Sequence, residues 1–511
     1  DQYGPQTTSV VDAELRRLAA AIAKRRGWGS IVFYPDDEAC TGQYGMMPAN
    51  PCDPWKLKHA LVDLDAALAR RGEMIGALLI IGGDSVVPFH RLPNPTDDSD
   101  GDVVSDSPYS TLDANYFVPE WPVGRLPGEA GPDAMTLLEQ IRQVHRFHNR
   151  HAKGIIPFSK EWLIWIKAQL RALIPQRSSP SFGYTAAIWR RSSLAVFRPI
   201  GAPHTVVASP PAFSGGLKRK LSANLGYYNL HGLEDSPSWY GQRDPQEAGA
   251  APDYPVALSP EDLHRNGRSP KFIFSEACYG GHIFGKSEKN SLALKFLSLG
   301  THGVVASTCI AYGSITTPLI AADLLGNLFW KHLRSGRPSG EALMQAKVDL
   351  VREMNRRQGY LDGEDQKTLI SFILYGDPLA SYEGFRVRSK AMVRSKEHPM
   401  VRTASAEEQE MLTPSKVPAE ILKGVKQVVA EYLPGADVAG IHFCRLQMKS
   451  NEKETHLDDS SLPGRKTGKN QSDRLVVTVS KQVLVAQHLH RHYLHVTMDE
   501  TGKTIKIALS R

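Results

Sequence analysis

The stretch KFIFSEACYGG, Lys271–Gly281, joins a short apolar run to an acid, a cysteine and two glycines. An uninterrupted apolar run of this length is typical of a strand that is buried on both faces of a parallel sheet. The predicted strand ends at Glu276, so Cys278 follows at its carboxyl end. Ligands bind outside the carboxyl ends of strands in open α/β sheets. The stretch therefore predicts both a parallel sheet and a reactive edge.

Strand-like and helical patterns alternate through the first three quarters of the chain, which predicts an α/β fold with a mainly parallel sheet. The other strand-like runs are at 76–84, 225–230, 303–307 and 370–376, and the main helical patterns are at 53–72, 132–152, about 159–174, 290–299, 318–334 and 339–357. The helix at 53–72 has the strongest start signal, because Asp53 can cap it and Pro54 fits its first position. After residue 384 this alternation stops.

The chain divides into four predicted segments, since 511 residues are too many for one ordinary domain. Residues 1–152 form an N-terminal α/β subdomain and 153–384 a catalytic subdomain. Residues 385–413 are charged and nonperiodic, which indicates an exposed basic linker. Residues 414–511 combine one helical pattern with strand-like runs, which predicts a small α+β domain.

Composition narrows the class of protein. A net charge of +7 is mild for this length, so no nucleic-acid partner is predicted. No apolar run of about 18 residues is present, so no membrane span is predicted. The five cysteines include no CxxC pair, which disfavours a disulfide scaffold and a structural zinc site. Sparse cysteine and the lack of an evident signal peptide favour the cytoplasm, with secretion left open.

A second strand-like run, LGYYNL (225–230), ends directly before His231 and Gly232. Parallel neighbours would bring His231 and Cys278 to the same sheet edge, as a nucleophile and its proton-transfer partner. The amides of Gly232 and Cys278 would then form an oxyanion hole. His231 lies 47 residues before Cys278, close to the spacing of about 50 in the caspase signature.

The motifs NLHG (229–232) and SEACYGG (275–281) resemble those of the clan CD cysteine peptidases, which include caspases, metacaspases, legumain, clostripain and gingipains. Three further stretches resemble the gingipain-type branch: LLIIGGDSVVPFHRLP (78–93), LDANYFVPEWPVGRLP (112–127) and LYGDPLA (374–380). The resemblance covers about residues 76–380. It implies a caspase-like doubly wound sheet in two portions, and a bacterial thiol protease. Cys278 would be its nucleophile and His231 its general acid/base, with no cofactor required.

Glu276 predicts the specificity of this enzyme. In the metacaspase and clostripain branches an Asp two residues before the cysteine selects arginine or lysine, and Glu276 holds that position. A buried carboxylate pairs best with a basic side chain, so we expect an endopeptidase that cleaves protein substrates after Arg or Lys. Legumain also has Glu-Ala-Cys, so an asparaginyl peptidase stays open. A non-catalytic caspase-like scaffold is the alternative from another class.

Several features outside the dyad carry further expectations. Trp239 is a candidate wall of the substrate pocket, and a packed loop aromatic is the equal alternative. Asp98, Asp100 and Asp102 alternate around Gly101 as calcium ligands would, although acidic loops are usually only solvated. An enzyme selecting basic residues would also cut its own basic linker, within 386–396. The 414–511 domain is a candidate docking site for a regulatory partner that switches the enzyme.

Overall fold

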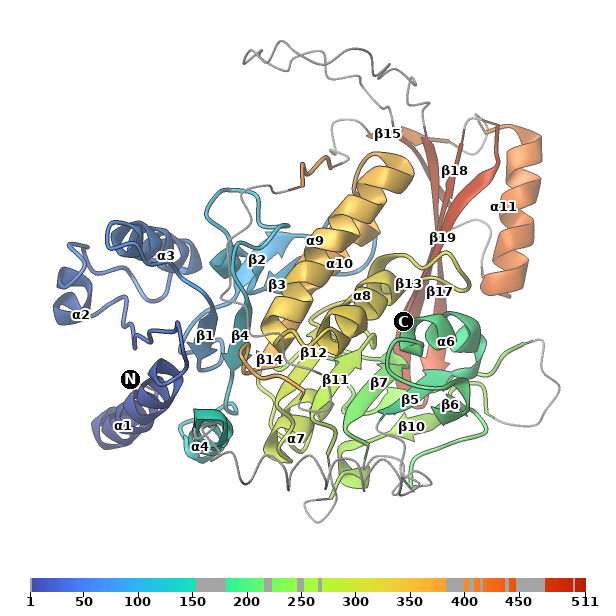
Figure 1. Cartoon of the computed structure of the whole chain (residues 1–511). Helices are drawn as coiled ribbons and strands as arrows, with labels where there is room; N and C mark the ends of the chain where they lie inside the picture. The colour runs from blue at the N-terminus through green and yellow to red at the C-terminus, as the bar shows by residue number, and fades with distance from the viewer. Residues whose placement is uncertain are drawn as a thin grey trace, which may run out of the picture.

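The computed structural model describes residues 2–152, 181–215, 223–245, 252–264, 269–382, 399–403, 409–413, 417–436, 441–446, 474–499 and 501–511. A large sheet with helices on both faces forms its centre, and a second sheet lies toward the C-terminus (Figure 1). The predicted helix near 159–174 and the predicted self-cleavage segment at 386–396 lie outside the described residues. None of the described helices is both long enough and apolar enough to cross a membrane.

The central sheet has eight strands in the order β1-β4-β14-β12-β11-β7-β5-β6. They are β1 (Leu78–Ile81), β4 (Val123–Leu126), β14 (Phe372–Gly376), β12 (Gly303–Ser307), β11 (Phe272–Ser275), β7 (Leu225–Asn229), β5 (Ser181–Ala186) and β6 (Val206–Ser209). Every pair is parallel except β12 with β14. The mainly parallel caspase-like sheet is therefore confirmed. It runs unbroken through both predicted subdomains, because β14 returns to pair with β4.

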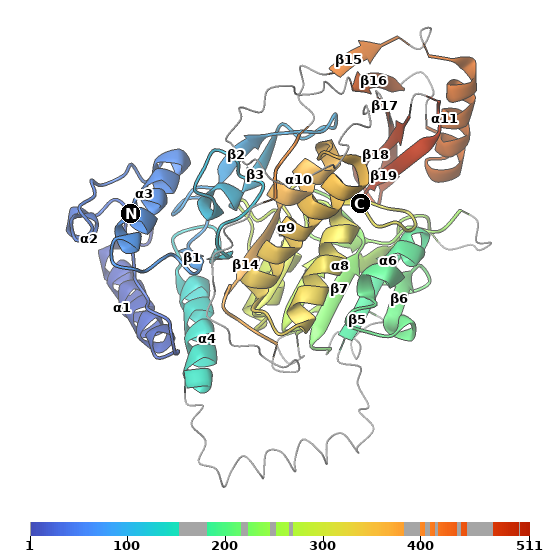
Figure 2. The ribbon, with the colours of Figure 1, turned by 45° about the horizontal axis from the view of Figure 1, so that its top comes forward.

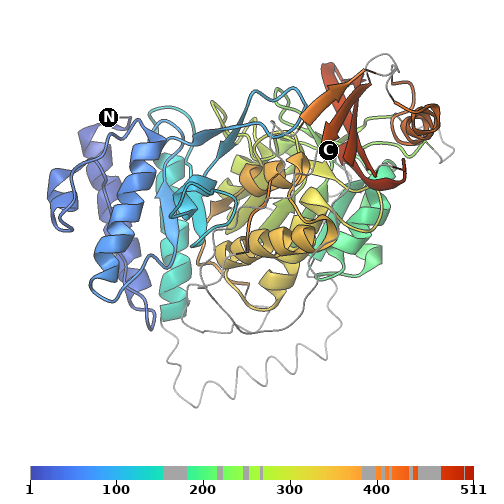
Figure 3. The same cartoon turned by 90° about the horizontal axis from the view of Figure 1, so that it is seen from above.

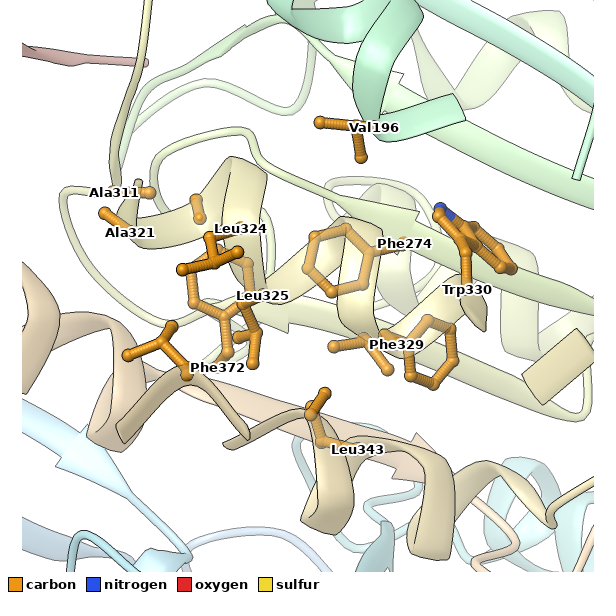
Figure 4. Close-up of a cluster of buried hydrophobic side chains, with 14 of the residues drawn as sticks. Val196, Phe274, Ala311, Ala321, Leu324, Leu325, Phe329, Trp330, Leu343 and Phe372 are labelled. Atoms are coloured by element: carbon orange, nitrogen blue, oxygen red, sulfur yellow. The ribbon is translucent and has the colours of Figure 1, made fainter. Parts of the chain in front are cut away.

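Strand residues alternate between the two faces of this sheet, as the period of a strand requires. Phe272 and Phe274 of β11 face a core formed with α6 (Arg190–Phe197), α8 (Ala321–Arg334) and α9 (Ser339–Gln358), whereas Ile273 faces α7 (Leu292–Ser298). In Figure 4, Phe274 lies among side chains of α8 and next to Phe372 of β14, with ring centroids 5.5 Å apart. Both faces are apolar, which explains the uninterrupted apolar run in the sequence.

The N-terminal helices gather at one end of the molecule, beside β1 and β4 (Figure 2). They are α1 (Gly4–Ala23), α2 (Glu38–Gly42), α3 (Pro54–Ala69) and α4 (Met135–Ala152). The predicted start of α3 is confirmed, because the Asp53 side chain accepts hydrogen bonds from the Trp55 and Lys56 amides. Helix α10 (Gly363–Ser371) leads into β14 and was not predicted.

The C-terminal sheet lies at the opposite end, as the view from above shows (Figure 3). Its antiparallel order is β13-β19-β18-β17-β16-β15, with α11 (Ala419–Tyr432) packed against it. The strands are β13 (Tyr312–Gly313), β19 (Thr504–Ser510), β18 (His488–Met498), β17 (Arg474–Val485), β16 (His442–Leu446) and β15 (Gln409–Leu412). β15 falls inside the predicted linker, and β13 belongs to the predicted subdomain at 153–384. The C-terminal domain therefore starts earlier than predicted and shares its sheet with that subdomain.

Two smaller sheets complete the described fold. One pairs β2 (His90–Pro93) with β3 (Asp102–Ser105), and the other contains β8 (His231–Gly232), β9 (Trp239–Tyr240) and β10 (Val256–Leu258).

Candidate active site

His231 and Cys278 follow two neighbouring strands of the central sheet. β7 and β11 pair in parallel, with Tyr228 opposite Ser275, so the residues after both strands leave the same edge. Both side chains are fully buried. A Cβ on Gly232 would collide with the carbonyl oxygen of Cys278. The two loops therefore approach closely only because residue 232 has no side chain.

The thiol of Cys278 is held by the segment after β12. Its Sγ accepts a hydrogen bond from the Ala311 amide at 3.2 Å. Burial raises the pKa of the Cys278 thiol to about 12, so the thiol is neutral in this arrangement. The next residue, Tyr279, has a φ of 54°, which is uncommon for a non-glycine residue. Its hydroxyl donates to Asp100 Oδ1 at 2.6 Å, which helps to hold this turn.

The imidazole of His231 is fixed by a hydrogen bond between Nε2 and Gln242 Oε1, at 2.8 Å. Its ring packs against Trp189, with centroids 4.4 Å apart. Burial lowers the pKa of His231 to about 3, and the positive charge that His490 can carry acts in the same direction. Contacts with Gln242 and the Arg511 main chain oppose this shift only in part. His231 is therefore neutral at ordinary pH.

A pocket with two carboxylates lies beside the thiol. Glu276 is fully buried, and its Oε1 accepts a hydrogen bond from the Tyr227 hydroxyl at 2.8 Å. Asp323, at the start of α8, is also fully buried, and its Oδ2 accepts a hydrogen bond from the Ser314 amide at 2.6 Å. Burial raises the pKa of Glu276 well above its usual range, and the nearby charge of Asp323 raises it further. The charge of Arg511 acts in the opposite direction and lowers this pKa, so a cation between the two acidic groups offsets their repulsion.

Arg511 of the same chain occupies this pocket. Its Nη2 forms an ion pair with Asp323 and donates to the Ser314 carbonyl oxygen at 2.8 Å. Its Nε lies 3.6 Å from Glu276 Oε2, and the guanidinium carbon lies 4.5 Å from the Trp189 ring centroid. The side chain is fully buried. Two carboxylates, one carbonyl and one aromatic face thus surround a single guanidinium.

The main chain before Arg511 runs along the site as an added strand. β19 pairs antiparallel with β13, so Ser510 lies opposite Tyr312 and Leu509 opposite Gly313. The Arg511 amide then donates to the Ala311 carbonyl oxygen at 2.9 Å. Extended peptides bind sheet edges in this way, with main-chain hydrogen bonds for affinity and a pocket for selectivity. The segment is placed as a bound peptide would be.

Two predicted site features have other roles in the structure. Trp239 is 4% exposed and packs against Tyr228 and Phe296, with centroids 5.3 and 6.3 Å away, on the face of the sheet covered by α7. This corrects its placement as a pocket wall, because β9 turns the ring into the core. Trp189, which the sequence analysis missed, provides the aromatic surface instead.

The three aspartates do not form a joint cluster of ligands within the part of the chain that the structure describes. Lys367 Nζ lies 2.5 Å from Asp98 Oδ2 and 2.6 Å from Asp100 Oδ2. Asp102 is exposed and pairs with Pro93 at the start of β3. Lys367 supplies the positive charge that a bound cation would supply, so the structure gives no support to the calcium prediction.

The model of peptidase family C25 matches residues 57–382, which is more than half of the chain. A solved structure titled "Structure of Protease" is similar with a TM-score of 0.45 and 11% identity, covering 97% of this chain and 94% of its own. No curated protein matches. The predicted resemblance to the gingipain-type cysteine peptidases is confirmed, and the chain belongs to peptidase family C25.

Proposed function

We propose that the protein is a cysteine endopeptidase that cleaves protein substrates after arginine, with Cys278 as nucleophile and His231 as general acid/base. Membership of family C25 establishes the coarser activity, that of a cysteine peptidase acting on proteins. One observation carries the specificity, which is the burial of the Arg511 side chain beside Glu276 and Asp323. The pocket selects by charge and by shape.

Charge balance favours arginine over the alternatives. An asparagine side chain would leave both carboxylates without a cation in a buried site, which is costly. A lysine ammonium would supply the charge, but it has a single nitrogen, whereas the guanidinium places Nη2 at Asp323 and Nε 3.6 Å from Glu276 Oε2. Stacking over Trp189 also favours a planar cation. Arginine is therefore preferred, lysine is second, and asparagine is disfavoured.

The proposed reaction begins with transfer of the thiol proton from Cys278 to His231, followed by attack of sulfur on the carbonyl carbon of the residue in the pocket. The amides of Gly232 and Cys278 donate to the developing oxyanion. His231 then protonates the leaving amine, and water hydrolyses the thioester, which returns the thiol. The opposite pKa shifts of Cys278 and His231 disfavour the ion pair in the closed site. We therefore infer that water must reach the dyad before the thiol can ionise.

The test is a panel of fluorogenic peptides that differ only in the residue before the scissile bond. Its leading peptide is Ala-Leu-Ser-Arg, which copies 508–511. We expect turnover with Arg above Lys, none with Asn, and complete loss in Cys278→Ala. Asp323→Asn should lower kcat/KM for Arg by roughly 10²-fold or more, since a buried ion pair loses one partner.

Two outcomes would overturn the proposal. Turnover after Asn would establish the legumain-like alternative. Failure of an arginyl chloromethyl ketone to label Cys278, in a protein whose C-terminal segment has been displaced or shortened, would favour the scaffold. The predicted self-cleavage within 386–396 is checked in the same preparation by mass spectrometry, with Cys278→Ala as the uncut control.

A further inference from the structure

Three buried histidines meet where the C-terminal sheet contacts the active site. His231 belongs to β8, whereas His490 and His492 belong to β18. Their exposed fractions are 0%, 8% and 1%. One ring nitrogen from each lies within 4.8 Å of the other two. Two strands that are far apart in the sequence therefore bring three imidazoles to one point.

The nitrogens at this point are unsatisfied. Among the described residues, no hydrogen bond is formed by Nδ1 of His231, Nε2 of His490 or Nε2 of His492, and the main chain of Arg511 also acts on the His231 ring and raises its pKa. A buried polar atom without a partner costs roughly 1–3 kcal/mol. Three histidines that each carry one such atom, and that each bring a ring nitrogen within 4.8 Å of the other two, indicate a ligand that accepts lone pairs from all three.

The hydrogen bond from His231 to Gln242 assigns the free lone pair. Gln242 Oε1 can only accept, so Nε2 of His231 carries the proton and Nδ1 presents its lone pair. Histidines that bind metals are commonly oriented in this way, with the second nitrogen donating to an outer partner. Gln242 therefore holds His231 in the tautomer that a metal ion requires.

We propose that His231, His490 and His492 bind one Zn²⁺ ion. Imidazole is a favoured ligand of this ion, and three histidines leave its fourth position for water. Zn–N bonds of about 2.0–2.1 Å place tetrahedral ligand nitrogens roughly 3.3 Å apart. The three nitrogens lie within 4.8 Å of one another, so small rotations of the rings close the site.

Zinc in this site would also regulate the enzyme. It would occupy the nitrogen with which His231 accepts a proton. It would also link β18 to β8, because its ligands come from both strands. Because β19 is the neighbour of β18, the same ion would hold Arg511 in its pocket. This consequence rests on the proposed function, whereas binding of the ion does not.

The test is a zinc titration of the full-length Cys278→Ala protein, which removes a thiol that could itself bind zinc and prevents self-cleavage. Calorimetry, or competition with a chromogenic chelator, gives the stoichiometry and the dissociation constant. His490→Ala, His492→Ala and the double variant are compared with His488→Ala. His488 is the matched control, because it lies on the same strand but contacts Asp235, with its Nδ1 2.9 Å from Oδ2.

We expect one site in the parent and in His488→Ala, weakened by at least about 100-fold in His490→Ala and His492→Ala, since loss of a direct ligand exceeds loss of an outer partner. Cobalt should give the intense visible absorption of a tetrahedral ion in the parent and in His488→Ala, but not in His490→Ala, His492→Ala or the double variant. His492→Gln, which retains most of the side-chain volume, replaces any variant that fails to fold. A parent without a saturable site, or a double variant with the parent's affinity, would overturn the proposal.

Peptide hydrolysis by the wild type then tests the regulatory consequence. Zinc should inhibit the wild type, a chelator should restore the rate, and the double variant should resist zinc. Inhibition that persists in the double variant would show that zinc acts elsewhere. A wild type that cleaves no peptide would count against the proposed function, while the zinc titration would still decide the metal site.

Discussion

Removing the Arg511 side chain should activate the enzyme toward free substrates. The guanidinium fills the pocket that a substrate arginine needs, and two cations cannot share it. In Arg511→Ala the C-terminal segment keeps the pairing of β19 with β13 but loses its contacts with Asp323, Glu276 and Trp189. The occupied state should therefore lose population to the open state.

The size of this effect can be estimated from the contacts. Removing one partner of a buried ion pair costs about 3–5 kcal/mol, and each 1.4 kcal/mol corresponds to about a factor of ten. The fraction of molecules whose pocket is free of residue 511 should therefore rise by roughly 10²–10⁴-fold. The lower end applies, because burial raises the pKa of Glu276 well above its usual range and so weakens the charge that this carboxyl offers to the arginine. We expect kcat/KM to rise by about 100-fold.

The assay is initial-rate hydrolysis of a peptidyl-arginyl coumarin substrate, below saturation. Arg491→Ala is the matched control, because Arg491 is an exposed arginine on β18, and Cys278→Ala gives the background. The apparent KM should account for most of the change, since occupancy reduces the competent fraction. An unchanged kcat/KM in a folded Arg511→Ala protein would refute the reasoning, because Arg511 would then not compete with substrate.

Three further substitutions test the site and its support. Gly232→Ala should abolish peptidase activity, because the added methyl group collides with the carbonyl oxygen of Cys278, and rates near wild type would contradict this. Lys367→Met should lower the free energy of unfolding by about 3–5 kcal/mol, since two buried aspartates lose their cation; urea unfolding with and without calcium checks this, and an unchanged midpoint would count against it. Burial lowers the pKa of Lys347 from 10.5 to about 7, so the unfolded chain holds more protons between these values and stability should rise with pH across that window. Lys347→Met should reduce this slope, which unfolding at a series of pH values measures.

Local patterns predicted five of the eight strands of the central sheet, β1, β7, β11, β12 and β14, and missed β4, β5 and β6. Runs such as the one at 271–276 are apolar because both faces of their strands are buried. Such a run can be recognised in the sequence without knowing which strands it pairs with. The unbroken sheet was not predictable in the same way. It depends on β14 pairing with β4, a contact between segments about 250 residues apart that leaves no mark on either one. The strand β15 was taken for linker for the same reason.

In the candidate site, too, residues with a local sequence pattern were predicted, whereas residues placed by long-range strand pairing were not. His231 and Cys278 were predicted to lie at one edge, because each follows a recognisable strand and precedes a glycine. Asp323 was missed, since an acid in the first turn of a helix is ordinary there and carries no motif. Arg511 was missed because its meaning depends on the pairing of β19 with β13. Trp239 was misplaced because a short strand decides which way its ring points.

The pairing of β19 with β13 makes the chain its own competitor. A ligand attached to the receptor acts at an effective concentration that is of order millimolar for short tethers. A free peptide must match that local concentration in addition to its own affinity. At micromolar substrate, the pocket of the intact chain would therefore be occupied by Arg511 most of the time. The measured rate would then depend on how often β19 separates from β13 rather than on how fast the thiol reacts.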